Sequence, residues 1–169
     1  MSNNKIEEIR DSADKLINSR EFEELTGIDP HQFKFNKKDL NGKYITKYNN
    51  GKTKTITHYK DGVKDGEYEE YYENGNIKLK CNFKNGKIDG NYILYDENGN
   101  PRKKYTYKNN ILNGEYIEYY SNGNIKLKCN FKNGEINGKY ITYYPNGKIQ
   151  SIQNIKTDKS NGKYIKYGE

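Results

Sequence analysis

Histidines, cysteines and paired carboxylates are the residues most able to do chemistry, and this 169-residue chain has few of them. The histidines and cysteines are His31, His58, Cys81 and Cys129. No pair of them has the spacing of metal ligands or of a nucleophile with its base. Carboxylates stand side by side in Glu69-Glu70 and Glu23-Glu24, but neighbours point to opposite faces of a strand and diverge on a helix. We therefore expect no catalytic residue, no metal site and no cofactor.

Glycines recur every 24 residues, and this period is the dominant feature of the chain. The leading series is Gly42, Gly66, Gly90, Gly114, Gly138 and Gly162. A second series is Gly51, Gly75, Gly99, Gly123 and Gly147, and a third is Gly62, Gly86, Asn110, Gly134 and Asp158. Asn-Gly or Asp-Gly between apolar runs is typical of a two-residue hairpin turn. The period predicts a tandem array of β-hairpins with turns at these glycines.

The segment NGNIKLKCNFKNG, which occurs identically at 74–86 and 122–134, alternates like a half-buried strand. If Asn74-Gly75 is a two-residue turn, one face of the hairpin is apolar, and we call it the core face. Its pairings are Tyr72 with Ile77, Glu70 with Leu79 and Tyr68 with Cys81. The same rule at Asn85-Gly86 places Phe83 opposite Ile88, which continues the core face into the next hairpin.

The opposite face carries tyrosine and lysine at regular intervals, with Tyr71 paired to Lys78 and Glu69 to Lys80. It is the candidate partner-binding surface, made of Tyr71, Tyr95, Tyr119, Tyr143, Lys78, Lys80, Lys126 and Lys128. Tyrosine supplies rigid contact area with a polar tip, as protein interfaces favour. Alternatively, the tyrosines and lysine stems only pack against one another to support a sheet that lacks a second layer. Both roles can hold together.

The core is expected to be thin, because Ile, Leu, Val and Phe make up only 31 of 169 residues. Disorder is an alternative at this level, but 18 tyrosines argue for a folded chain. The expected fold is mainly β, an elongated single antiparallel sheet that grows by roughly 10 Å per repeat. Cys81 and Cys129 should then stand roughly 19 Å apart, too far for a disulfide, and remain free thiols.

Two regions are expected. Residues 1–40 are an N-terminal helical cap and linker, with Ile6, Ile9, Ala13, Leu16 and Ile17 at helical spacing. This cap either covers the open edge of the first repeat or contacts a partner. Residues 41–169 are the hairpin array, with units starting at 42, 66, 90, 114, 138 and 162.

The charge of the chain is uneven. Residues 1–40 hold 7 Lys and Arg against 9 Asp and Glu, whereas residues 41–169 hold 23 against 14. Only three of the basic residues are arginine, which favours diffuse attraction over specific recognition of phosphates or bases. The beginning of the chain lacks the apolar core of a signal peptide, and no stretch is long and apolar enough to be transmembrane, which predicts a cytoplasmic protein.

The units GEYEEYYENGNIKLKCNFKNGKID, GNYILYDENGN and GKYITYYPNGKIQ resemble the bacterial variant of the MORN repeat, as found in YwqK-type proteins. The resemblance covers 42–167, with departures at Lys47, Asp96 and the IKTDKSN segment. It implies a non-enzymatic, protein-binding hairpin array, and an antitoxin or immunity partner of a toxin or nuclease effector. The alternative is that the Lys and Tyr side chains bind nucleic acid or anionic lipid. A homodimer through the sheet edge is also open.

Overall fold

The sheet is built from thirteen strands in a computed structural model that describes residues 40–155 and the strand backbone at 164–166. The strands are β1 (Gly42–Lys47), β2 (Thr53–Lys60), β3 (Val63–Tyr71), β4 (Ile77–Lys84), β5 (Lys87–Tyr95), β6 (Pro101–Lys108), β7 (Ile111–Leu112), β8 (Gly114–Tyr119), β9 (Ile125–Lys132), β10 (Glu135–Ile136), β11 (Gly138–Tyr143), β12 (Ile149–Ile155) and β13 (Tyr164–Lys166). The helical cap expected over residues 1–40 lies outside the described residues, apart from Leu40.

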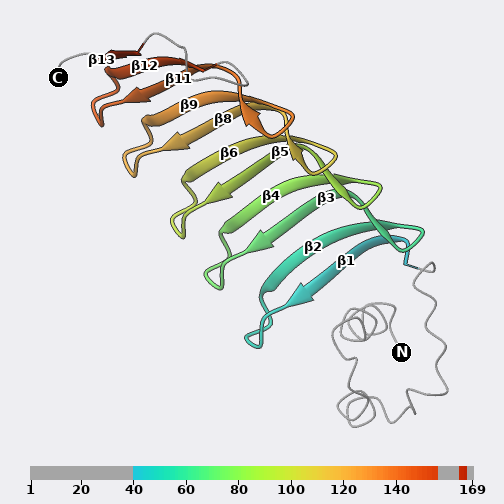
Figure 1. Cartoon of the computed structure of the whole chain (residues 1–169). Helices are drawn as coiled ribbons and strands as arrows, with labels where there is room; N and C mark the ends of the chain where they lie inside the picture. Colours follow the sequence, from blue (N-terminus) through green and yellow to red (C-terminus); the bar gives the residue numbers. More distant parts are fainter. Residues whose placement is uncertain (1–39, 156–163, 167–169) are drawn as a thin grey trace, which may run out of the picture.

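Neighbouring strands follow one another in the chain and all pair antiparallel. The order is β1-β2-β3-β4-β5-β6-β8-β9-β11-β12-β13, while the short strands β7 and β10 extend the pairing of β6 and β9. Figure 1 shows the hairpins stacked side by side along one direction, with turns at both ends of the strands. The expected elongated, single antiparallel sheet is confirmed.

The register of the sheet agrees with the sequence prediction in its middle and departs from it near one turn. The pairs Tyr68–Cys81, Glu70–Leu79, Glu69–Lys80 and Phe83–Ile88 are confirmed. The predicted pairs Tyr72–Ile77 and Tyr71–Lys78 are wrong, because the register shifts after Glu70 and Tyr71 lies opposite Ile77.

A three-residue loop causes this shift. The carbonyl oxygen of Tyr72 accepts the N–H of Gly75 at 2.9 Å, and the N–H of Tyr72 donates to the Asn76 oxygen at 2.8 Å. Of these loop residues only Gly75 has a positive φ, 97°. This is a β-turn followed by a bulge with glycine in the left-handed region. The second glycine series therefore marks three-residue loops, whereas two-residue turns were predicted.

The other two glycine series differ from each other. Asn85 and Gly86 both have positive φ, 49° and 76°, as a two-residue type I′ turn requires. The third series is confirmed as turns at Gly62, Gly86, Asn110 and Gly134, while Asp158 lies outside the described residues. Gly66, of the leading series, lies inside β3 with φ 111°. The register shifts beside it, between Thr57 and Tyr59 of β2. Turns at the leading glycines of the described residues were therefore predicted wrongly: Gly66 and Gly90 lie inside strands and Gly42, Gly114 and Gly138 begin strands, while Gly162 lies outside the described residues.

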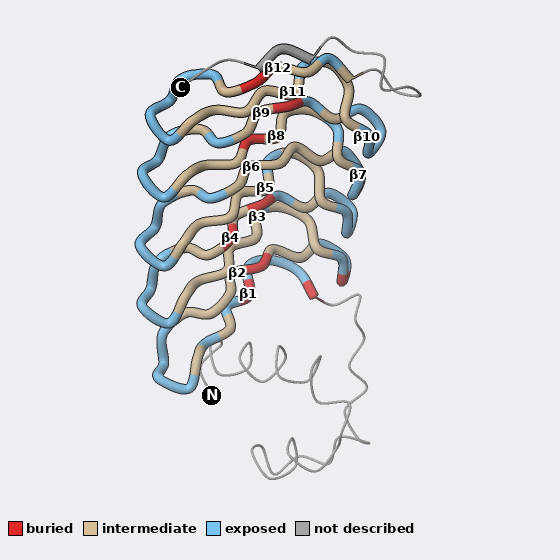
Figure 2. Tube along the Cα trace, turned by 60° about the vertical axis from the view of Figure 1, so that its left-hand side comes forward, coloured by how far each residue is buried: buried red, intermediate tan, exposed pale blue. Residues whose placement is uncertain are grey.

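The core is as thin as the composition predicts. The buried apolar side chains are Leu40, Tyr44, Leu79, Cys81, Ile117 and Cys129, and most of the others are only half-buried. Figure 2 shows buried positions near the middle of the strands and exposed turns at both edges of the sheet. On the core face, Tyr68, Cys81, Tyr92 and Tyr105 stand opposite one another across successive strands. Aromatic rings packed edge to face, such as Tyr68 with Phe83 and Tyr92 with Tyr105, bury apolar surface in this single layer.

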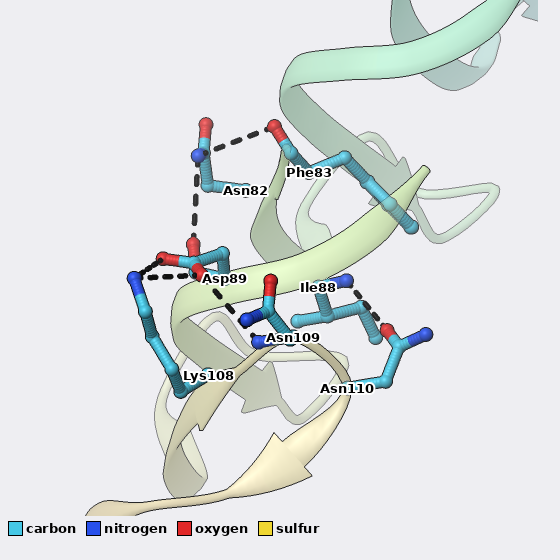
Figure 3. Close-up of polar contacts among 7 residues, drawn as sticks. All are labelled: Asn82, Phe83, Ile88, Asp89, Lys108, Asn109 and Asn110. Carbon is cyan, nitrogen blue, oxygen red and sulfur yellow. Dashed lines mark hydrogen bonds and ion pairs between the residues drawn. The ribbon is translucent and has the colours of Figure 1, made fainter. Parts of the chain in front are cut away.

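Polar side chains link neighbouring hairpins at the ends of the strands. At the end where the type I′ turns lie, the Asp89 carboxylate lies 3.1 Å from the Lys108 ammonium and accepts the N–H of Asn109 at 3.4 Å. Beside it, the Asn110 side-chain oxygen accepts the N–H of Ile88 at 2.6 Å, as Figure 3 shows. The Lys108 hydrogen bond holds the pKa of Asp89 below its usual value. One repeat thus supplies the caps for the turn of its neighbour.

Candidate interaction surface

The face opposite the core carries a continuous row of isoleucine and charged side chains. Direct cross-strand pairing runs through Ile45, Ile56, Glu69, Lys80, Ile93, Lys104, Ile117, Lys128, Ile141 and Ile152. Residues directly opposite each other share a face, so these ten form one line across the sheet. We call it the isoleucine-lysine row.

In the first half of the row, Lys80 is neutralised by acids of its own sheet. Its ammonium lies 2.9 Å from Glu69 and 4.0 Å from Glu67. The Tyr71 hydroxyl also donates to Glu69, at 2.5 Å. The Tyr71 and Lys80 hydrogen bonds lower the pKa of Glu69, while burial, followed by Glu69, raises the pKa of Tyr71 to about 12. Tyr71, Glu69 and Lys80 form a closed polar network.

In the second half of the row, Lys128 has a different partner. Its ammonium lies 2.7 Å from Glu115, which also lies 3.7 Å from Lys104. Hydrogen bonding to Lys128 holds the pKa of Glu115 below its usual value. The position equivalent to Glu69 is Ile117, which is only 7% exposed. Two lysines therefore share one carboxylate here.

The four tyrosines assigned to this surface fall at the same point of successive repeats. Tyr71, Tyr95, Tyr119 and Tyr143 each end the first strand of a hairpin. Tyr95 lies close enough to Lys80, and Tyr119 and Tyr143 to Lys128, to affect the pKa of those lysines. All four are half-buried, so part of each ring remains accessible.

Lys78 and Lys126, also assigned to this surface, extend their ammonium groups toward core-face residues. Lys78 binds Glu70 at 2.8 Å and lies 6.0 Å from the centre of the Tyr72 ring. Lys126 binds Glu118 at 3.0 Å, and Glu118 accepts the Tyr116 hydroxyl at 3.2 Å. The bulge after the three-residue loop sets two residues opposite one and turns these lysines away from the predicted direction. Of the four predicted lysines, Lys80 and Lys128 stand in the row.

Sequence reasoning found the pair of Glu69 with Lys80 but missed Glu67, Glu115 and the isoleucines around these lysines. Glu67 and Glu115 pair with the lysines of the row, and Lys104 belongs to it. A signal was available in the 24-residue period. The positions equivalent to Glu69 are Ile45, Ile93, Ile117 and Ile141, so Glu69 is the single charged member of its series.

The core face adds a cluster of half-buried tyrosine rings in the middle of the array. Tyr105 stacks within 5.8 Å of Tyr92, 6.1 Å of Tyr107 and 5.0 Å of Tyr116, measured between ring centroids. Position 105 is the equivalent of Cys81 and Cys129, where the flanking repeats carry a small side chain. Burial raises the pKa of both cysteine thiols to about 11, and both are free, as expected.

The described array contains neither a metal-ligand cluster nor a membrane-spanning helix. Within residues 40–155, His, Cys, Asp and Glu side chains form no group of three that could hold a metal ion. The described part of the chain also contains no helix long and apolar enough to cross a membrane. The described surface is a broad open face on which the same kinds of side chain recur at regular intervals.

The repeat geometry agrees with a family comparison. The family described as MORN repeat variant matches residues 40–61, 64–85, 88–109, 112–133 and 136–157. The five matches follow one another at the 24-residue interval and together span more than half of the chain. The chain belongs to the MORN repeat variant family. MORN repeats are generally binding modules for proteins or membrane lipids.

The first four MORN matches each span one hairpin and end at a type I′ turn, so the family unit is offset by two residues from the units counted from the leading glycines. The sixth predicted unit, from Gly162, lies beyond the last match, and Gly162 lies outside the described residues. A search among curated proteins gave no match to this MORN protein.

Proposed function

We propose that the chain is a non-enzymatic inhibitor of the antitoxin or immunity type, which binds a toxin or nuclease effector and covers its active site. The isoleucine-lysine row with its flanking tyrosines carries this proposal. It presents amphipathic rings and lysine stems on a sheet that lacks a second layer, at intervals of roughly 10 Å. We expect a bacterial, cytoplasmic protein, because the repeats resemble the bacterial MORN variant and the sequence has no signal-peptide or transmembrane pattern.

The pairing of the lysines favours a protein partner over a polyanion. Binding to nucleic acid depends on lysines that can neutralise phosphates. Here Lys80 and Lys128 are already held by glutamates at 2.9 and 2.7 Å. The surface is therefore a mixed, largely neutralised one, and mixed charge around aromatic anchors is typical of protein interfaces.

Photo-cross-linking in the native cell tests the proposal. The full chain would carry a photoreactive residue at Tyr119 or Tyr143, and in a control at Tyr107, which belongs to the ring cluster of the core face. We expect one stoichiometric protein to be cross-linked from the first two positions and to lose its toxic activity when the chain is present. Cross-links from Tyr107 alone, or no specific protein, would contradict the proposal. Light scattering distinguishes a complex from a homodimer through the sheet edge.

A second candidate, binding of nucleic acid or anionic lipid, is supported by a different set of lysines. Lys60, Lys84 and Lys132 are exposed at equivalent positions before successive type I′ turns. This edge could attract a polyanion in a salt-dependent manner. The test is retention on heparin and on anionic vesicles as salt rises, for the parent and a Lys84→Glu, Lys132→Glu variant. Retention that the variant does not reduce would exclude this candidate.

A further inference from the structure

The two halves of the isoleucine-lysine row differ in local charge. In the first half, one lysine of the row, Lys80, faces the two acids Glu67 and Glu69. In the second half, two lysines, Lys104 and Lys128, share the single acid Glu115. The segments 66–89 and 114–137 differ at only four of their 24 positions, and Glu69 against Ile117 is the difference that lies in the row. Ile56, which lies outside that segment, is the equivalent of Lys104, so two row positions separate the two charge patterns.

The second half still has hydrogen-bonding capacity. A lysine ammonium has three N–H donors, and Glu115 accepts from Lys128 at 2.7 Å and lies farther from Lys104, at 3.7 Å. The side chains of Lys104 and Lys128 are 32% and 42% exposed, so a carboxylate from outside can reach both. Between them lies Ile117, buried, and the half-buried Tyr119 ends the same strand.

The spacing of the lysines matches the repeat of an α-helix. Lys104 and Lys128 stand two strands apart, which is about 10 Å. Seven residues of helix rise about 10.5 Å and return to the same helical face. A helix that lies across the strands can thus set two carboxylates, seven residues apart, onto these two lysines.

We propose, on the basis of the proposed function, that the partner presents an acidic amphipathic helix to the second half of the row. Carboxylates seven residues apart bind Lys104 and Lys128, and the apolar side chains between them rest on the ring of Tyr119. The first half does not suit such a helix, because Ile56 stands where the second half has Lys104, and Glu69 repels the acids of the helix. Positions 56 and 69, with their equivalents 104 and 117, determine where the helix binds.

A synthetic helix provides the probe. We would use a peptide of about 18 residues with two glutamates seven residues apart and leucines on the same face between them. In the control peptide, of equal composition, the second glutamate is moved to the other face. Fluorescence anisotropy with the full chain should show that the first peptide binds about tenfold more tightly than the control, with a salt-dependent affinity.

Two exchange variants locate the site. Ile117→Glu places the acid of the first half between Lys104 and Lys128 and should weaken binding about tenfold, whereas Glu69→Ile should bind at least as tightly as the parent. Since Glu69 itself occupies the equivalent position of a strand, Ile117→Glu is compatible with the fold. If it fails to fold, Lys104→Gln with Lys128→Gln replaces it, with the same expected loss.

The helix proposal would be overturned if the two peptides bound equally. It would also be overturned if Ile117→Glu, or the Lys104→Gln, Lys128→Gln variant that replaces it, bound the first peptide as tightly as the parent. The cross-linking experiment keeps this failure distinct from failure of the proposed function. If the native partner still binds Ile117→Glu and the two peptides bind equally, the helix proposal fails but the proposed function stands. The chain then contacts its partner in another way. A parent chain that captures no specific protein contradicts the proposed function itself.

Discussion

The Tyr72 hydroxyl donates to the backbone carbonyl oxygen of Tyr95 at 2.8 Å and so fastens one hairpin loop to the first strand of the next repeat. Tyr48 makes the same bond to Tyr71, and Tyr120 to Tyr143. In the repeat between those of Tyr72 and Tyr120, the equivalent residue is Asp96. Its carboxylate accepts the N–H groups of Asn98 and Asn100 in its own loop.

These hydroxyl bonds should contribute measurably to stability. Tyr72→Phe and Tyr120→Phe each remove one donor and leave a carbonyl oxygen unpaired, so we expect each to lower the free energy of unfolding by about 1 kcal/mol. Tyr95→Phe is the control, because no hydroxyl bond of Tyr95 exists within the described array. Urea unfolding measures the difference. A loss no larger than that of the control would refute the fastening role.

The leading glycines should differ in their tolerance of a side chain. Gly90 and Gly114 have φ of 105° and 123°, so alanine is strained at both. A Cβ at Gly114 would also meet Thr106 Cβ and Cγ2 at 3.0 Å, whereas nothing lies within 4 Å of one at Gly90. We expect Gly90→Ala to cost about 1–2 kcal/mol and Gly114→Ala about 1–3 kcal/mol more.

Thermal unfolding of the two glycine variants would show this difference, and the double change Gly114→Ala with Thr106→Ala should recover part of it. Equal losses at Gly90 and Gly114 would show that the Thr106 contact is unimportant.

Alkaline pH should unfold the array. Burial, followed by the nearby Glu70 carboxylate, raises the pKa of Tyr68 to about 12 from the ordinary 10.0. Because the folded state holds the proton more tightly, this contribution is complete below pH 10 and is lost as pH rises toward 12. Tyrosinate absorbance should therefore appear together with unfolding, and Tyr68→Phe should reduce the pH dependence. Tyrosinate formation near pH 10 by all tyrosines of a folded chain would contradict the expectation.

The cysteines should report on opening of the sheet. Cys81 and Cys129 are 4% and 3% exposed, and burial raises the pKa of both thiols to about 11. Alkylation requires thiolate, so iodoacetamide at pH 8 should label neither in the folded chain and both in denaturant. Mass spectrometry of the labelled peptides gives the rate at each site. Rapid labelling without denaturant would mean that the core face opens readily.

Much of the fold could be predicted from the sequence because the repeat shows each local signal several times. Asn85-Gly86 met the requirement of a type I′ turn, and Phe83 opposite Ile88 followed from it. Asn74-Gly75 has the same letters but forms a longer loop, since only Gly75 adopts positive φ. An Asn-Gly pair tolerates both geometries, so its letters alone do not choose between them.

The candidate surface was predicted less completely for the same reason. A one-residue difference in loop length redirected Lys78 toward Glu70, while Lys80, beyond the bulge, kept its predicted pair with Glu69. The partner of Lys128 depends on Ile117 standing where Glu69 stands in the earlier repeat, a relation that appears only when equivalent positions are compared. Whether the eight assigned residues bind a partner stays a prediction.

The Asp96 repeat has a consequence for how the array comes apart. Between β6 and β8 the direct pairs are Lys103 with Glu118 and Lys104 with Ile117, the short strand β7 adds two pairs to β6, and no loop hydroxyl crosses this boundary in the described residues. The β9 and β11 boundary is as short but keeps the Tyr120 bond. Heat or pulling force should therefore divide the sheet first at its middle, into two cooperative units of similar size, and amide hydrogen exchange should find a seam there rather than fraying from the ends alone.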